Sequence, residues 1–222
     1  MTLESKFFVN SFEEKIYRWK SRNAFNPFAP YWDTVILKDS YRLDETVNLL
    51  ELVKEKEKTG LFANEQWTHY NIFLWEDSEL QNLKKYIKDQ YSYLCKSLNI
   101  NEERTLYING WVYPQKQNQT LKRHSHAIHE NSFLSGNLIL NYSTNLSRYH
   151  IPYVSDSEGD FVVESKPGTF LLFPSYLSHS TDTLVDKERY VIAFDIITQK
   201  GIDTFRIHNQ NVNDPIHRAV VL

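Results

Sequence analysis

The sequence predicts an α+β fold in which a mainly helical first half supports a β-rich second half. Apolar residues recur at helical spacing in the first hundred positions, and short β-branched and aromatic runs separated by turn residues follow from Thr105 onward. The 14 Tyr, 13 Phe and 5 Trp suit a β-rich domain with an aromatic-lined cleft. Short strands after a helical segment are typical of a double-stranded β-helix (jelly roll) backed by helices.

Two helices are predicted in the first half. The first spans residues 44–58, where Leu43, Val47, Leu50 and Val53 share one face and Gly60 ends the helix. The second spans residues 78–98, and Asp77 or Ser78 is suited to cap it. Its apolar stripe is formed by Leu80, Leu83, Ile87, Tyr91, Leu94 and Leu98. We interpret both helices as packing elements rather than as parts of a site.

Five strands are predicted in the second half. They span residues 106–113, 133–141, 159–164, 169–173 and 190–198. The long polar segment from Tyr142 to Glu158 is expected to form a flap over the mouth of the barrel. We therefore expect one domain, 1–222, with helical support (1–104), a jelly-roll core (105–198) and a C-terminal extension (199–222) that closes the fold or pairs with a partner.

Composition narrows the class of protein. A net charge of −3 gives no reason to expect nucleic-acid or acidic-membrane binding, and no apolar run is long enough for a membrane span. Cys95 is the only cysteine, so no internal disulfide is available and a reducing compartment is favoured. The start shows no secretory signal. We expect a cytoplasmic protein, and its oligomeric state is not indicated.

Three histidines are predicted to bind one metal ion. His124 and His126 lie two positions apart, which on a strand places both imidazoles on the same face. His179, which follows another predicted strand, would complete a facial set and leave coordination positions open. Iron(II) accepts imidazole ligands in such open sites. His69, His150, His208 and His217 are expected to be bystanders. His129 and Glu130 either gate the pocket or, as we favour, lie in a surface loop beside the pair.

Arg189, on the last predicted strand, is the candidate for binding a carboxylate. A guanidinium can clamp a carboxylate in a bidentate manner. A 2-oxo acid that chelates iron through its first carboxylate and keto oxygen needs such a cation for its far carboxylate. We expect Tyr113 and Ser135 to assist Arg189, and Trp111 and Asn109 to contact substrate. No catalytic side chain beyond the metal ligands is predicted.

These residues resemble the 2-oxoglutarate/Fe(II)-dependent oxygenases, and in particular a branch common in phage and bacterial genomes. The matching motifs are His124-Ser125-His126, Leu134-Ser135-Gly136, Leu172-Phe173-Pro174-Ser175, His179 and Arg189. Tyr113-Pro114 and Arg123-His124 are more loosely similar to elements of prolyl hydroxylases, and by that similarity Tyr113 contacts the far end of 2-oxoglutarate. The resemblance spans about Thr105 to Thr198. It implies Fe(II), 2-oxoglutarate and O₂, and hydroxylation of an unactivated C–H bond in a peptide or protein side chain or a small metabolite.

Position 126 departs from the family pattern, because most members have a carboxylate there. The sequence leaves three arrangements open. His126 binds the metal directly; or it lies behind His124 and His179, which bind alongside water; or a carboxylate from elsewhere, such as Glu130 or Asp182, completes the site.

Two other functions compete with this interpretation. One is a jelly-roll metalloenzyme without 2-oxoglutarate, either a three-histidine iron dioxygenase or a zinc hydrolase. Such enzymes have no need of a buried arginine, so Arg189 discriminates against them. The other is a non-catalytic jelly-roll binding module, which predicts no tight metal uptake.

Overall fold

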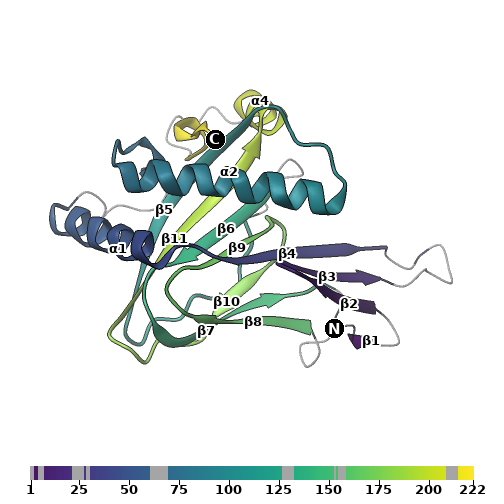
Figure 1. Cartoon of the computed structure of the whole chain (residues 1–222), viewed down its shortest axis with the longest axis horizontal. Coiled ribbons are helices and arrows are strands. Elements are labelled where there is room, and N and C mark those ends of the chain that lie inside the picture. Colours follow the sequence, from purple (N-terminus) through teal and green to yellow (C-terminus); the bar gives the residue numbers. More distant parts are fainter. Residues whose placement is uncertain are drawn as a thin grey trace.

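The computed structural model describes residues 3–4, 8–21, 28, 31–60, 70–126, 133–152, 154, 159–208 and 215–222. Over these residues the chain forms two β-sheets, and two long helices cover one side of the larger sheet (Figure 1). The main apolar core lies between that sheet and the helices. The candidate site lies between the two sheets.

Each sheet is antiparallel between its hydrogen-bonded neighbours. The larger one, in spatial order, consists of β1 (Leu3–Glu4), β2 (Phe8–Glu13), β3 (Ile16–Ser21), β4 (Asp33–Ser40), β9 (Thr169–Pro174), β6 (Leu134–Ile139), β11 (Glu188–Thr198), β5 (Leu106–Lys116) and β12 (Val220–Val221). The smaller one consists of β10 (His179–Thr181), β7 (Ser143–His150) and β8 (Asp160–Ser165).

The strand order confirms the predicted double-stranded β-helix. From β6 onward the chain passes from the larger sheet to the smaller (β7, β8), back to the larger (β9), to the smaller (β10) and finally to the larger (β11). All five strands predicted in the second half are present, with boundaries shifted by a few residues at most. The structure adds β7 and β10, which form most of the smaller sheet.

Side-chain alternation along β5 and β11 separates two environments. The side facing the helices is apolar and includes Ile108, Val112, Ile192 and Phe194. The opposite side faces the smaller sheet and carries the polar residues. The two strands pair along their whole length, with Trp111 opposite Ala193 and Gln115 opposite Arg189. Side chains at every second position of both strands therefore point into the space between the two sheets, where neighbours across the strand pair lie close together.

The two predicted helices are confirmed as α1 (Leu43–Lys58) and α2 (Ser78–Leu98). The stripe predicted for α2 is buried from Leu80 to Leu94. The stripe predicted for α1 is wrong at Leu43 and Val47, which are 62% and 45% exposed. Val53 is buried and Leu50 is partly buried against the core, and the other buried residues are Thr46 and Leu49. The weak amphipathicity of α1 left its buried face ambiguous.

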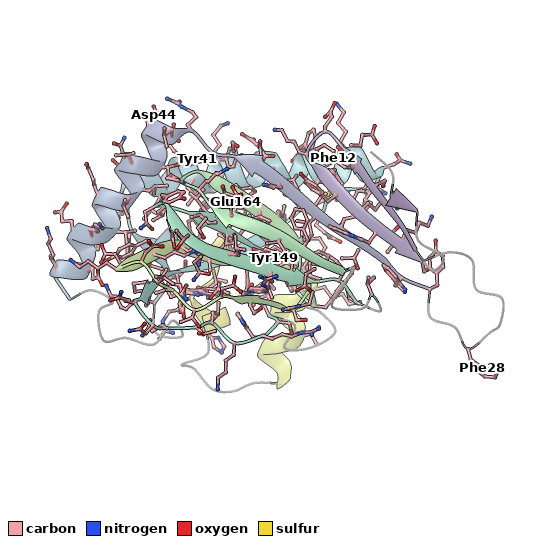
Figure 2. The ribbon with its side chains drawn as sticks, turned by 90° about the horizontal axis from the view of Figure 1, so that it is seen from below. Phe12, Phe28, Tyr41, Asp44, Tyr149 and Glu164 are labelled. Atoms are coloured by element: carbon pink, nitrogen blue, oxygen red, sulfur yellow. The ribbon has the colours of Figure 1, made fainter. Side chains whose placement is uncertain are left out.

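The prediction of mainly helical support in residues 1–104 is wrong for the start of the chain, because the described residues among the first forty include β1 to β4 and no helix. Strands β2 and β3 form a hairpin. Tyr17 and Trp19 lie two positions apart on β3, so both side chains point to the same side and pack in the core between the sheets. Strand β4 pairs with β9, with Leu37 opposite Leu172, so the hairpin extends the larger sheet. Figure 2 shows Phe12 on this extension and Tyr149 near the middle of the molecule.

The predicted flap is also wrong, because Ser143–His150 forms β7, the central strand of the smaller sheet. Polar residues in this segment suggested a loop, but Asn145 and Ser147 are buried and point inward to other polar groups. A strand lining a polar interior lacks the apolar alternation used to recognise strands. Tyr153 and residues 155–158 lie outside the described part of the chain.

The C-terminal extension contributes to the fold. It contains α4 (Gln199–His208), a 3₁₀ helix, η3 (Pro215–Arg218), and β12, which pairs with β5 and so covers that edge of the larger sheet. Another 3₁₀ helix, η2 (Ile72–Leu74), packs against β5. None of the described helices is long and apolar enough to cross a membrane.

Candidate metal centre and anion pocket

Three histidines converge at one end of the space between the sheets. His179 begins β10, and its main chain exchanges two hydrogen bonds, of 2.8 and 3.0 Å, with that of His124. The His126 main-chain N–H donates to the carbonyl of Ser175 at 3.0 Å, which holds the second imidazole beside the first. One nitrogen from each of the three rings lies within 4.8 Å of those from the other two. The structure therefore brings together all three predicted metal ligands.

Hydrogen bonds fix the tautomer of each ring. The Nδ1 atoms of His124 and His179 lie 2.8 and 3.2 Å from the main-chain carbonyls of Lys122 and Leu177. Nδ1 of His126 lies 2.7 Å from Oδ1 of Asp195. Carbonyl and carboxylate oxygens only accept, so Nδ1 is the donor in every case and Nε2 carries the lone pair. Oriented imidazoles with a bonded Nδ1–H are typical of metal ligands.

The protein environment keeps two of the rings neutral. Burial, together with the neighbouring imidazoles, lowers the pKa of His179 from 6.5 to about 3. Burial also lowers the pKa of His124. Burial acts in the same direction on His126, but the Asp195 carboxylate outweighs it and raises the pKa of His126. Neutral imidazole is the form that binds a metal ion.

The lowered pKa of His179 makes the metal-free protein sensitive to acid. Between pH 6.5 and about 3 the unfolded chain binds a proton at this residue that the folded chain excludes. Its contribution to stability is complete above pH 6.5 and is lost as the pH falls through that window. We expect the unfolding free energy of the wild type to fall with decreasing pH more steeply than that of His179→Gln. The difference between the two slopes should correspond to the uptake of up to about one additional proton per molecule on unfolding. Parallel pH profiles from denaturant titrations would contradict this.

A cavity of about 400 Å³ connects the three histidines with Arg189. Trp111 and Tyr113 on β5, and Val191 and Ala193 on β11, line it from the larger sheet. Ser147, Tyr149 and Thr181 line it from the smaller sheet. The Tyr149 ring stacks on His179 at a centroid distance of 5.5 Å, and Trp111 lies 5.5 Å from His126.

Arg189 is a buried cation held by neutral groups. It is 3% exposed, its Nε donates to Ser165 Oγ at 2.8 Å, and its Nη2 donates to Ser147 Oγ at 2.8 Å. A longer contact of 3.5 Å joins Nη1 to Oε1 of Gln115. Among the described residues no carboxylate pairs with Arg189, and burial lowers its pKa to about 10. Burying a charge without a counter-charge is costly, so the site favours an anionic ligand.

The remaining donors of Arg189 suit a carboxylate. A guanidinium has five N–H groups, and the three contacts above occupy one on Nε, one on Nη1 and one on Nη2. One N–H is left on each terminal nitrogen, and a guanidinium can bind a carboxylate through its two terminal nitrogens. Tyr113 also lines the cavity near Arg189, and burial, partly offset by that cation, raises the pKa of Tyr113.

The structure does not place Ser135 beside Arg189. Its hydroxyl is fully buried and contacts Asp195 Oδ1 at 2.6 Å and Ser175 Oγ at 2.9 Å, next to His126. The serines that contact Arg189 are Ser147 and Ser165. The register of the strands accounts for the error. Ser135 points inward, but the pairing of β6 with β11 places it opposite Asp195, six residues beyond Arg189.

The two predicted substrate contacts differ in position. Trp111 lines the cavity, whereas Asn109 is buried beside it on the same side of β5 and is not part of the cavity wall. Among the described residues its Oδ1 has no hydrogen-bond partner. The substrate-binding roles of both residues stay predictions.

Several other predicted candidates are placed away from the metal centre. Asp182, considered as a ligand, pairs instead with Arg148 at 2.9 Å. His150 bonds to Asp160 and Ser180, and His217 is exposed. His69, His129 and Glu130 lie outside the described residues, as does the side chain of His208.

Sequence reasoning missed Asp195, Ser147 and Ser165. Asp195 had a recognisable signal, because it is a charged residue in the apolar run of β11. It also lies at two-residue spacing from Arg189, Val191 and Ala193, so that all four side chains point to the same side of the strand. The two serines had none, since small hydroxyl residues are common in exposed strands and only the packing of the smaller sheet turns them inward.

The fold and the site together define a double-stranded β-helix with a three-histidine candidate metal centre and a buried arginine in one cavity. No family model matches the sequence, and neither does any curated protein sequence. Solved structures do match. A prolyl-4-hydroxylase from Pseudomonas putida has a TM-score of 0.57 at 12% identity, covering 74% of this chain and 88% of that one.

Two further solved structures share the fold. The non-heme alpha ketoglutarate-dependent epimerase SnoN from nogalamycin biosynthesis has a TM-score of 0.55 at 12% identity, covering 73% of this chain and 77% of that one. The non-heme monooxygenase ThoJ, as its nickel complex, has a TM-score of 0.54 at 14% identity, covering 72% and 71%. At these identities the likeness establishes the fold, and the chemistry rests on the site itself.

Proposed function

We propose that the protein is an Fe(II)- and 2-oxoglutarate-dependent oxygenase that uses O₂ to hydroxylate an unactivated C–H bond. The observation that carries the proposal is Arg189, a buried cation without a carboxylate partner among the described residues, in the same cavity as three convergent imidazoles. A 2-oxo acid with a second carboxylate spans these two features, since one end chelates a metal and the other is an anion.

The residues present fit an iron(II) ion. The donor set is three imidazoles, with two held neutral by burial and all three oriented through Nδ1. Three protein ligands leave positions for a bidentate co-substrate and for O₂. The fold adds support, because SnoN, which shares it, has been solved with Fe³⁺ and alpha ketoglutarate.

In this proposal His124, His126 and His179 hold the metal, and Arg189 binds the far carboxylate with Tyr113 beside it. Val191 and Ala193 provide the apolar floor between these ends, so that the chain of the 2-oxo acid displaces water. Iron bound here, with O₂ and the 2-oxo acid, supplies the oxidising power for C–H hydroxylation. The protein contributes orientation and exclusion of water, and we propose a peptide or protein side chain or a small metabolite as substrate.

The far carboxylate provides a direct test of the pocket. We expect protein loaded with Ni(II), as a stand-in for iron, to bind 2-oxoglutarate about 10 to 100 times more tightly than 2-oxopentanoate. The two ligands share the chelating group and chain length, and only the former offers a carboxylate to Arg189. Isothermal titration with both acids measures the ratio. Equal affinities, or no binding of either acid to metal-loaded protein, would favour a metalloenzyme that does not use 2-oxoglutarate.

A further inference from the structure

Asp195 lies on the inward side of β11 and lines the cavity close to the metal centre. Its neighbour across the strand pair with β6 is Ser135. Strand β11 is an interior strand of the larger sheet, and its main chain is hydrogen-bonded to β5 on one side and to β6 on the other.

Two donors converge on a single oxygen of this carboxylate. Oδ1 accepts from Nδ1 of His126 at 2.7 Å and from the Ser135 hydroxyl at 2.6 Å. The Ser135 hydroxyl also lies 2.9 Å from Oγ of Ser175, so the carboxylate and the two serine hydroxyls form one chain of contacts.

Ser175 connects the two ends of this network. Its hydroxyl lies 2.9 Å from that of Ser135, and its carbonyl accepts from the main-chain N–H of His126 at 3.0 Å. The main chain of His126 and the carboxylate that orients its ring are thus tied to the same residue. All of these groups are buried or partly buried, where charge-assisted hydrogen bonds are stronger than in water.

The three imidazoles are consequently not equivalent. His124 and His179 donate to neutral main-chain carbonyls, whereas His126 donates to a charged side chain. Asp195 itself is not a member of the group of side chains whose ligand atoms converge. Its carboxylate contacts the ring of His126 instead.

We propose that Asp195 is the positioning residue of the metal centre. Held by Ser135 and Ser175, it fixes the ring orientation and tautomer of His126 and makes Nε2 of that ring a stronger donor to the metal. This inference rests on the proposed function only in requiring that the three histidines bind a metal ion. A carboxylate behind a metal-bound histidine raises the basicity of the ring, and its loss typically weakens metal binding 10- to 100-fold.

The test compares metal affinity in Asp195→Asn, Ser135→Ala and Asp182→Asn. Zn(II) affinity is measured by competition with a chromophoric chelator, without 2-oxoglutarate or O₂. We expect Asp195→Asn to weaken binding about 10- to 100-fold. Ser135→Ala, which retains the carboxylate and loses one of its donors, is expected to weaken it about fivefold or less. Asp182→Asn removes the same charge at a partly exposed ion pair with Arg148 and should leave affinity unchanged.

A spectroscopic readout separates positioning from a general loss of structure. In zinc-loaded wild type, the Nδ1 proton of His126 should resonate far downfield, and it should move upfield in Asp195→Asn while the protons of His124 and His179 stay in place. The inference is wrong if Asp195→Asn and Ser135→Ala both fold and bind Zn(II) as tightly as the wild type. It is also wrong if the Nδ1 protons of all three histidines shift alike in Asp195→Asn. A wild type that binds no Zn(II) or Fe(II) would instead overturn the proposed function, and with it this inference. Metal binding without 2-oxoglutarate binding would leave this inference standing.

Discussion

Arg189→Met is expected to weaken 2-oxoglutarate binding strongly while leaving metal binding and folding intact. The guanidinium offers two unused N–H groups to the far carboxylate in a cavity where water competes little. Each charge-assisted hydrogen bond of this kind contributes about 1.5 to 3 kcal/mol, so the affinity of metal-loaded protein for 2-oxoglutarate should fall on the order of 100-fold or more. Titration calorimetry measures this loss.

The stability of the same variant distinguishes a functional arginine from a structural one. Methionine matches the length of the arginine stem and removes a cation that has no carboxylate partner among the described residues. We expect its unfolding free energy without ligands to equal or exceed that of the wild type, because the cost of burying the charge is removed. Destabilisation by about 3 to 5 kcal/mol, as when a buried ion pair is broken, would show that Arg189 is structural. Arg148→Met, at a partly exposed ion pair, serves as the matched control.

His179→Ala is expected to weaken Fe(II) binding roughly 100- to 1000-fold, by removing one of three ligands from the centre. His179 is 8% exposed and its main chain is held by β10, so the loss of the imidazole leaves a gap that the neighbouring strands cannot close easily. Binding is measured anaerobically by competition with a chelator.

His150→Ala provides the matched control for His179→Ala. His150 lies on the same sheet, and its ring bonds to Asp160 and Ser180 instead of facing the other imidazoles. It should retain wild-type iron affinity. An equal loss in both variants would indicate general damage to the smaller sheet, and an unchanged affinity in His179→Ala would remove this residue from the metal centre.

The fold was predictable wherever one side of an element is apolar. Helix α2 and strand β9 have clear apolar patterns, and their predicted boundaries nearly match the observed ones. Strand β7 was missed because its inward residues, such as Asn145 and Ser147, are polar. The hairpin of β2 and β3 was missed because its aromatic pattern indicates a buried side only when the pairing of β4 with β9 is known, which attaches the hairpin to the rest of the larger sheet.

The site was predictable where function demands an unusual residue. On an extended chain, the two-residue spacing of His124 and His126 by itself places both imidazoles on the same side. A lone arginine in an apolar strand likewise indicates a buried charge. Asp195 is recognisable as a charged residue in an apolar strand, but its contact with His126, like that of Ser165 with Arg189, depends on which strands face each other. Sequence spacing showed which side chains point inward, but not which inward residues meet.

The central claim is that one cavity binds iron(II) and 2-oxoglutarate together. The most direct measurement is an anaerobic titration of the metal-free protein with Fe(II) and then 2-oxoglutarate, followed by visible absorption. We expect a metal-to-ligand charge-transfer band that develops only after both additions, saturates at one equivalent per chain, and is absent from Arg189→Met at the same concentrations. Iron uptake without a band in the wild type, at any 2-oxoglutarate concentration, would contradict the claim.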